Sequence, residues 1–206
     1  MSGAADTKII AVLCARHKSN YAGMLGVEIY DKKRDARTFS GDCSVIAHPP
    51  CRSFSAFCSK QAKPEAGERE LAFWCVDQVR EFGGILEQPA HSMLWKLAGL
   101  PMPGDNPRNG NFSMEVWQCW WGFPQIKRTW LFFSGINLKS VRTPLTLHAN
   151  GRDRRTWQLM STPQRSTTPR AFCEWLVSVA RMAESSSFQE TISLRTGSAV
   201  TGGKAL

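Results

Sequence analysis

A cysteine that follows two prolines at the end of an apolar strand is the residue of this chain best placed for chemistry. The residues around Val45-Ile46-Ala47-His48-Pro49-Pro50-Cys51 predict a buried strand over 44–48 that stops at the prolines. Proline fixes its own backbone and cannot donate to a sheet ladder, so the next residue is expected at the rim of the fold. Ligands of open α/β sheets bind at strand tips, and a thiol is a strong latent nucleophile. Cys51 is therefore the predicted nucleophile.

A carboxylate ends a second short apolar segment. Glu87 closes the predicted strand 85–87 just before Pro89. Because an unpaired buried carboxylate is costly, this position predicts a functional role for Glu87. His48 lies beneath the Pro-Pro-Cys loop. It is either a hydrogen-bonded structural residue or a base for Cys51, and we favour the structural interpretation.

The cysteine spacing does not favour metal chemistry. Cys43, His48, Cys51 and Cys58 contain no paired Cys-x-x-Cys, so we predict no metal site. A zinc deaminase needs Pro-Cys-x-x-Cys, of which Pro50-Cys51 supplies only the first half. The seven cysteines are odd in number and lie mostly in apolar contexts, which indicates a reducing compartment rather than a disulfide framework.

The elements that must position these residues alternate between strands and helices. The apolar patterns predict strands over 8–14, 26–30, 44–48 and 85–87, and helices over 65–82, 91–100 and from the N-cap Thr168 to 182. Two further strands, 114–121 and 129–134, flank the turn at 122–124 and predict an edge hairpin. Alternating elements predict an α/β fold with a Rossmann-like, mostly parallel sheet, helices on both faces and an antiparallel edge hairpin.

Length and composition predict one domain and a tail. Residues 1–184 are expected to form a single domain, and the Ser/Thr/Gly-rich segment 185–206 is expected to be disordered. No run of about 18 apolar residues exists, and the first residues lack the features of a signal peptide. We therefore expect a cytoplasmic protein without membrane contact.

Positive charge is concentrated in one part of the chain. The formal net charge is +9, and residues 120–181 hold ten Lys and Arg against two acids. This excess predicts a polyanionic partner, most commonly nucleic acid, although a solvated basic face gives the same count. Trp120, Trp121, Trp130 and Trp157 lie among these charges and allow base stacking, but tryptophan is more often found in the core.

Three segments resemble motifs of DNA cytosine-5 methyltransferases, in the same order and at similar spacing. The segment His48-Pro49-Pro50-Cys51-Arg52-Ser53-Phe54-Ser55 resembles their Pro-Cys loop, and Leu86-Glu87-Gln88-Pro89 resembles their Glu-Asn-Val strand end. Residues 122–135 resemble their Gly-x-Pro-Gln-x-Arg-x-Arg segment and the strand that follows. Val27-Glu28-Ile29-Tyr30-Asp31 is similar to the end of their second strand. The resemblance spans roughly residues 8 to 135 and implies a methyltransferase-type sheet.

The chain also resembles short phage-encoded proteins. Those proteins carry a lead-in like Tyr30-Asp31 and Arg34-Asp35-Ala36 before a His-Pro-Pro-Cys-Arg motif. A phage origin would place this protein in the cytoplasm of a bacterial host.

The methyltransferase resemblance implies a reaction at C5 of cytosine. Addition of a thiolate at C6 makes C5 nucleophilic, and a carboxyl near N3 stabilises the adduct. By this resemblance Cys51 is the nucleophile and Glu87 the N3 partner. Binding of substrate or nucleic acid is implied for Pro50, Arg52, Ser53, Ser55, Gln125, Lys127 and Arg128. The base must be flipped out of a duplex, or come from a single strand or a free nucleotide.

Two features of the sequence depart from the family pattern. Lys127 stands where the family has its first Arg and Thr129 where it has the second, and lysine does not reproduce bidentate arginine geometry. The resemblance implies S-adenosylmethionine as cofactor, bound by Glu28 and Asp31. However, residues 15–21 lack the family's glycine-rich cofactor loop. About eleven residues separate the first two strands, the lower limit for a crossover that contains a helix.

Three interpretations stay open. The first is a DNA-modifying enzyme that uses Cys51 and Glu87 with S-adenosylmethionine or another donor. The second is a catalytically inactive protein of methyltransferase fold that binds nucleic acid. The third is modification of an exocyclic amine, but such enzymes usually carry an aromatic residue after the two prolines, where this chain has Cys51.

Overall fold

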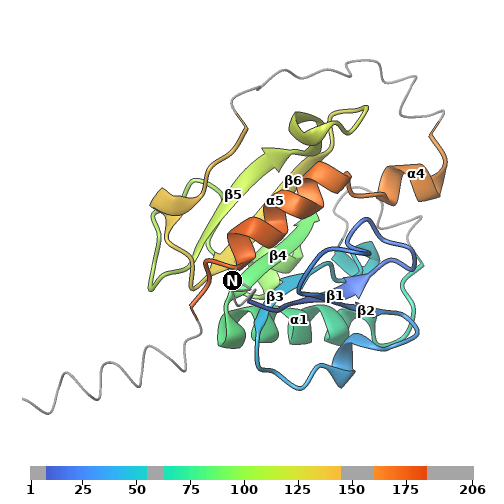
Figure 1. Ribbon diagram of the computed structural model, residues 1–206, viewed down its shortest axis with the longest axis horizontal. Helices are drawn as coiled ribbons and strands as arrows, with labels where there is room; N and C mark the ends of the chain where they lie inside the picture. Colours follow the sequence, from blue (N-terminus) through green and yellow to red (C-terminus); the bar gives the residue numbers. More distant parts are fainter. Residues whose placement is uncertain (1–7, 55–62, 145–159, 185–206) are drawn as a thin grey trace, which may run out of the picture.

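A six-stranded sheet organises the part of the chain that the computed structural model describes, residues 8–54, 63–144 and 160–184 (Figure 1). The strand order is β2-β1-β3-β4-β6-β5. Each strand begins and ends as follows: β1 (Ile10–Ala15), β2 (Val27–Asp31), β3 (Ser44–Ala47), β4 (Gly84–Pro89), β5 (Phe112–Trp117) and β6 (Arg128–Ser134).

The sheet is parallel at its centre and antiparallel at one edge. β1 pairs in parallel with β2 and with β3, and β3 pairs in parallel with β4. β6 then runs antiparallel to both β4 and β5, which makes β5 and β6 a hairpin at the sheet edge. β1 is continuously apolar over Ile10–Leu13 and fully buried there, as expected of a central parallel strand. The predicted α/β class, mostly parallel sheet and edge hairpin are confirmed.

Helices cover both faces of this sheet, as predicted. α1 (Glu68–Phe82) buries Ala72, Cys75, Val76 and Val79 against one face. α5 (Arg170–Ala180) buries Phe172, Cys173, Leu176 and Val179 against the other. The two helices lie on opposite sides of the strands in Figure 1. The core is therefore divided by the sheet into two apolar layers.

The connection between β1 and β2 contains no helix. Residues 16–26 form turns, because the segment is too short for a helical crossover. α5, from the far end of the described chain, packs on the face of the sheet opposite α1. It contacts Trp121, whose ring centroid lies 4.7 Å from that of Phe172. The 16–21 turn directly follows the carboxyl end of β1 and therefore lies at the carboxyl edge of the parallel strands.

Several element boundaries differ from the prediction. α1 begins at Glu68 rather than 65, and the predicted helix 91–100 contains only α2 (Leu94–Leu97). The predicted strand 114–121 ends at Trp117, because a 3-10 helix, η3 (Gln118–Trp121), turns the chain before Gly122. Pro169, not Thr168, occupies the N-cap of α5. The remaining elements are η1 (Ala36–Thr38), η2 (Arg52–Phe54), η4 (Leu138–Ser140) and α4 (Thr162–Ser166).

Among the described residues, no helix is both long enough and apolar enough to cross a membrane. The predicted tail, 185–206, lies outside the described residues.

The edge hairpin is held by a carboxylate with several donors. Glu115 on β5 accepts hydrogen bonds from Arg128 Nε at 2.7 Å and Nη2 at 2.8 Å. The indole N–H groups of Trp130 and Trp117 each donate to the same carboxylate at 3.0 Å. The bond from Arg128 is the main reason why the pKa of Glu115 is lowered to about 2. Arg128, which the resemblance assigns to the substrate, is thus paired within the sheet.

We expect Glu115→Gln to destabilise the protein at neutral pH but not in strong acid. A carboxyl whose pKa is depressed in the folded state adds stability above its unfolded pKa of about 4.5, and this stability is lost as the pH falls toward 2. Because Arg128 is half-exposed, the screened loss at pH 7 should be about 1 kcal/mol. Urea unfolding of both proteins between pH 7 and pH 3 measures the difference, which should shrink as pH falls. A difference independent of pH would contradict the assignment.

Candidate active site

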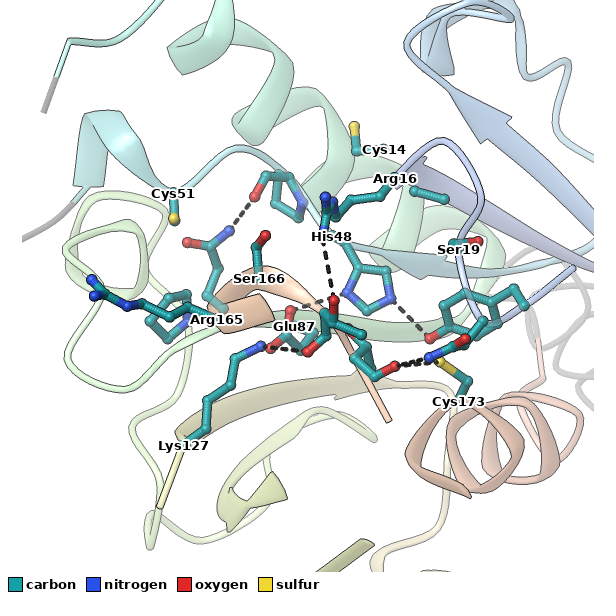
Figure 2. Close-up of a pocket in the computed structure, with 18 of the residues that line it drawn as sticks. Cys14, Arg16, Ser19, His48, Cys51, Glu87, Lys127, Arg165, Ser166 and Cys173 are labelled. Carbon is teal, nitrogen blue, oxygen red and sulfur yellow. Dashed lines mark hydrogen bonds and ion pairs between the residues drawn. The ribbon is translucent and has the colours of Figure 1, made fainter. Parts of the chain in front are cut away.

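A pocket of about 810 Å³ opens at the carboxyl ends of the parallel strands β1, β3 and β4 (Figure 2). Open α/β sheets bind ligands at this edge. Its walls are the turn after β1, the Pro-Pro-Cys loop after β3, the end of β4, residues 126–128 at the start of β6, and residues 164–168 with Cys173. The strands thus bring five separate parts of the sequence to one cavity of a size typical for small ligands.

His48 and Glu87 form the largely buried centre of this pocket. His48 Nδ1 lies 3.0 Å from Glu87 Oε2, and His48 Nε2 lies 2.8 Å from the hydroxyl of Tyr21. An ionised carboxylate only accepts, so Nδ1 carries the proton, and in the neutral imidazole Tyr21 donates to Nε2. Gln118 Nε2 donates to the other carboxylate oxygen, Oε1, at 3.1 Å. His48 is therefore a hydrogen-bonded partner of Glu87, the role we favoured from the sequence.

These contacts keep Glu87 ionised in spite of its burial. Burial by itself raises the pKa of Glu87, but the hydrogen bond from His48 and the charge of Lys127 outweigh it, and the net pKa is lowered. Lys127 shares this environment: desolvation lowers its pKa, and the nearby Glu87 carboxylate opposes that shift. Its ammonium also donates to the Thr167 carbonyl at 3.4 Å. Figure 2 shows His48 and Lys127 both pointing toward Glu87.

Cys51 is an exposed thiol in the wall of the same pocket. Desolvation by the surrounding protein, and then the charge of Glu87, raise its pKa above 9.0, whereas Lys127 and Arg52 act in the opposite direction. At neutral pH the thiol form therefore predominates. A reaction at Cys51 needs a base or a nearby cation to favour the thiolate.

The loop that carries Cys51 is held by β4 and the segment after it. The buried side chain of Gln88 donates to the carbonyl of Pro49 and accepts from Ser92 Oγ at 3.3 Å. The backbone N–H of Met93 donates to the carbonyl of Phe54 at 2.9 Å. These bonds tie the Pro-Pro-Cys loop to β4, which carries Glu87 and, unlike the predicted strand 85–87, continues to Pro89. The relative position of the two groups is therefore built into the fold.

The structure distributes the other predicted substrate-binding residues unevenly. Pro50, Lys127 and Arg128 line the pocket with Cys51, although Arg128 is paired with Glu115. Arg52 instead pairs with Glu65 at 3.1 Å and with Glu68. Arg52, Ser53 and the buried Gln125 do not line the pocket, and Ser55 lies outside the described residues.

Neither predicted cofactor-binding acid lines the pocket. Glu28 pairs with Arg34 at 2.9 Å. Asp31 accepts from His17 Nδ1 at 3.0 Å and from the backbone N–H groups of Lys33 and Arg34. The bond with His17 is the main cause of a lowered Asp31 pKa. Both carboxylates therefore have protein partners.

Among residues 8–54, 63–144 and 160–184, no three His, Cys, Asp or Glu side chains gather as metal ligands. Of the cysteines weighed for zinc, Cys58 lies outside the described residues.

Sequence reasoning missed four polar residues of the site: Tyr21, Gln88, Gln118 and Arg16. The sequence does contain an indication of Gln88 and Gln118, because each is a neutral polar residue in an apolar run. Both are almost fully buried. Tyr21 and Arg16 lie in a turn whose sequence does not indicate that it faces β3 and β4. Only the parallel pairing of the strands brings them there.

Comparison with known proteins adds no family to this description. No family model, no curated protein and no solved structure matches the chain. The fold defines an α/β protein whose mostly parallel sheet is compatible with a Rossmann-like arrangement.

Proposed function

We propose that this protein is a DNA-modifying enzyme that acts at C5 of a pyrimidine, cytosine in particular, with Cys51 as nucleophile. The observation that carries the proposal is that Cys51, Glu87 and Lys127 line one pocket at the sheet edge where α/β proteins bind ligands. The resemblance to DNA cytosine-5 methyltransferases implies Cys51 as nucleophile, Glu87 as N3 partner and Lys127 among the substrate-binding residues. The mostly parallel sheet with its antiparallel edge hairpin also agrees with that resemblance.

The groups in the pocket suit addition of the thiol to the pyrimidine ring. The sulfur of Cys51 forms a bond to C6, and the C5=C6 electron pair shifts so that negative charge develops at N3. The proton lost by the thiol is the proton gained by N3, and Glu87, ionised before the reaction, can relay it. Lys127 favours the thiolate, because its positive charge lowers the pKa of Cys51. The adduct is then a C5 nucleophile.

Gln118 and Thr129 have positioning roles in this scheme. Gln118 Nε2 donates to Glu87 Oε1 and also lies 3.1 Å from Thr129 Oγ1. Thr129, at the family's second arginine position, is fully buried and therefore supports Glu87 rather than a phosphate. Of the three cations that the resemblance assigns to the substrate, Arg52 and Arg128 form ion pairs with glutamates, which leaves Lys127 for this role.

The source of the group added at C5 is not assigned to S-adenosylmethionine. Both acids expected to bind it, Glu28 and Asp31, have protein partners outside the pocket. The wall where the resemblance expects glycines carries Arg16, His17 and Lys18 instead. These residues therefore do not fit that cofactor.

Covalent trapping tests the proposal without a donor. In a single-stranded oligonucleotide with 5-azacytosine, the ring nitrogen at position 5 takes a proton after thiol addition, so the adduct accumulates. We expect the wild-type protein to form an adduct that mass spectrometry locates at Cys51, and Cys51→Ala to form none. Stable binding of the oligonucleotide without any adduct, at pH values up to 9, would overturn the proposal.

One observation favours a second candidate, a nucleic-acid-binding protein of the same fold without turnover. The raised pKa of Cys51 leaves the thiol mostly protonated at neutral pH, the less reactive state. The same trapping experiment separates the two candidates, because the binding protein would retain the oligonucleotide only non-covalently.

A further inference from the structure

The charge of the pocket is unbalanced. Glu87 is the only acid among the residues that line it, against five Lys and Arg side chains: Arg16, Lys18, Lys127, Arg128 and Arg165. Glu115, which lies outside the pocket, pairs with Arg128, and Asp31, also outside, pairs with His17. Glu87 itself is already hydrogen-bonded to His48 and Gln118. Among the residues that line the pocket, positively charged side chains therefore outnumber acidic ones by four.

Part of this charge lies on the wall formed by the turn after β1, a segment separate from the Pro-Pro-Cys loop. Arg16 and Lys18 come from this turn, and Arg165 comes from α4, which lines the same pocket. Arg16 Nη1 is 3.4 Å from Thr167 Oγ1, so the two sides are close together. Figure 2 shows Arg16 extending toward the centre of the pocket, above Glu87.

The same wall offers a hydroxyl donor. Ser19 lines the pocket, and its Oγ is buried with no hydrogen-bond partner among the described residues. Guanidinium, ammonium and hydroxyl groups together are the donors that recognise phosphate oxygens. S-adenosylmethionine carries no phosphate and has a net positive charge, so this group of donors does not favour it.

We infer that the wall formed by Arg16–Ser19 binds a phosphate group of the ligand whose reactive part lies at Cys51. The inference rests on the proposed function, because that function defines which end of the pocket reacts. The phosphate belongs either to a nucleotide substrate or to a phosphorylated donor. Both sources present the same chemistry to Arg16 and Lys18.

Titration calorimetry at low salt tests this site with inorganic pyrophosphate, deoxycytidine 5′-monophosphate, deoxycytidine and S-adenosylmethionine. We expect saturable pyrophosphate binding that Arg16→Gln/Lys18→Gln weakens about tenfold or more. The control Lys96→Gln/Lys139→Gln removes the same charge from exposed positions outside the pocket and should stay within about twofold of wild type. Equal weakening in both double variants, or no saturable pyrophosphate binding, would overturn the inference.

The other ligands identify the source of the phosphate. If the monophosphate binds more tightly than deoxycytidine, and the Arg16/Lys18 variant removes that advantage, the site takes the substrate phosphate. If the monophosphate and deoxycytidine bind equally well, while the Arg16/Lys18 variant still weakens pyrophosphate binding, the site takes the phosphate of a donor. Saturable S-adenosylmethionine binding that competes with pyrophosphate overturns the inference but not the proposed reaction. Loss of the Cys51 adduct with intact pyrophosphate binding overturns the proposed reaction alone.

Discussion

Glu87→Gln is expected to make Cys51 more reactive toward a simple alkylating agent and far less reactive toward a pyrimidine. The charge of Glu87 raises the pKa of Cys51, so its removal increases the thiolate fraction near pH 8. Alkylation of Cys51 by iodoacetamide should become about two- to fivefold faster. Without a carboxylate to relay the proton to N3, adduct formation with the 5-azacytosine oligonucleotide should fall about 100-fold or more.

These opposite changes distinguish a catalytic carboxylate from a structural one. Mass spectrometry of the peptide that contains Cys51 gives both rates, each followed from pH 7 to pH 10. The wild-type alkylation rate should keep rising above pH 9, because the pKa of the thiol is raised, and the midpoint for Glu87→Gln should lie lower. Glu70→Gln, an exposed carboxylate on α1, is the matched control and should change neither rate. If both rates fall together in Glu87→Gln, Glu87 serves only to hold the loop.

Gly84→Ala is expected to destabilise the protein severely. Gly84 begins β4 with φ +135°, and a Cβ atom there would lie 1.9 Å from the backbone oxygen of Val45 on β3. The two residues are paired in the parallel ladder, so the clash is with backbone that cannot move without separating the strands. Backbone strain and overpacking together should lower the free energy of unfolding by roughly 3 kcal/mol or more. The variant should also impair adduct formation, since β3 leads to Cys51 and β4 to Glu87.

Gly99→Ala provides the control for backbone strain alone. Gly99 also has a positive φ, +62°, but a Cβ atom there meets nothing within 4 Å. Its replacement should cost only about 1 kcal/mol. Urea unfolding measures both variants. Similar losses for the two glycines would show that the close approach of β3 and β4 is not what requires Gly84.

Much of the architecture could be predicted from local patterns. Continuous apolar runs predicted the buried central strands, and spacing of apolar residues along 65–82 predicted the helix that became α1. Errors lay where a short-range pattern was ambiguous. The run from Met114 to Trp121 has strand composition throughout, but the turn before β6 bends its last residues into a 3-10 helix. Propensity cannot specify where pairing stops, because that depends on the partner strand.

The candidate site was less predictable than the fold. Arg52 and Arg128 carry the charge expected of substrate-binding residues, yet each has a carboxylate partner that is distant in sequence or on another strand. Glu28 likewise pairs with Arg34. A sequence shows which side chains can bind an anion or a hydroxyl group. It does not show which of them the folded protein has already paired.

By itself the sequence determined where the reactive groups stand along the chain. Two prolines after an apolar strand place Cys51 just beyond a strand end, and a second apolar segment followed by Pro89 places Glu87 near the end of β4, because both effects depend only on neighbouring residues. The tertiary structure alone decided which side chains surround them. Parallel pairing of β1, β3 and β4 brings Tyr21 and Arg16 to the same edge, and packing of α5 adds Cys173. Hydrogen bonds and charge in the pocket follow from these long-range contacts.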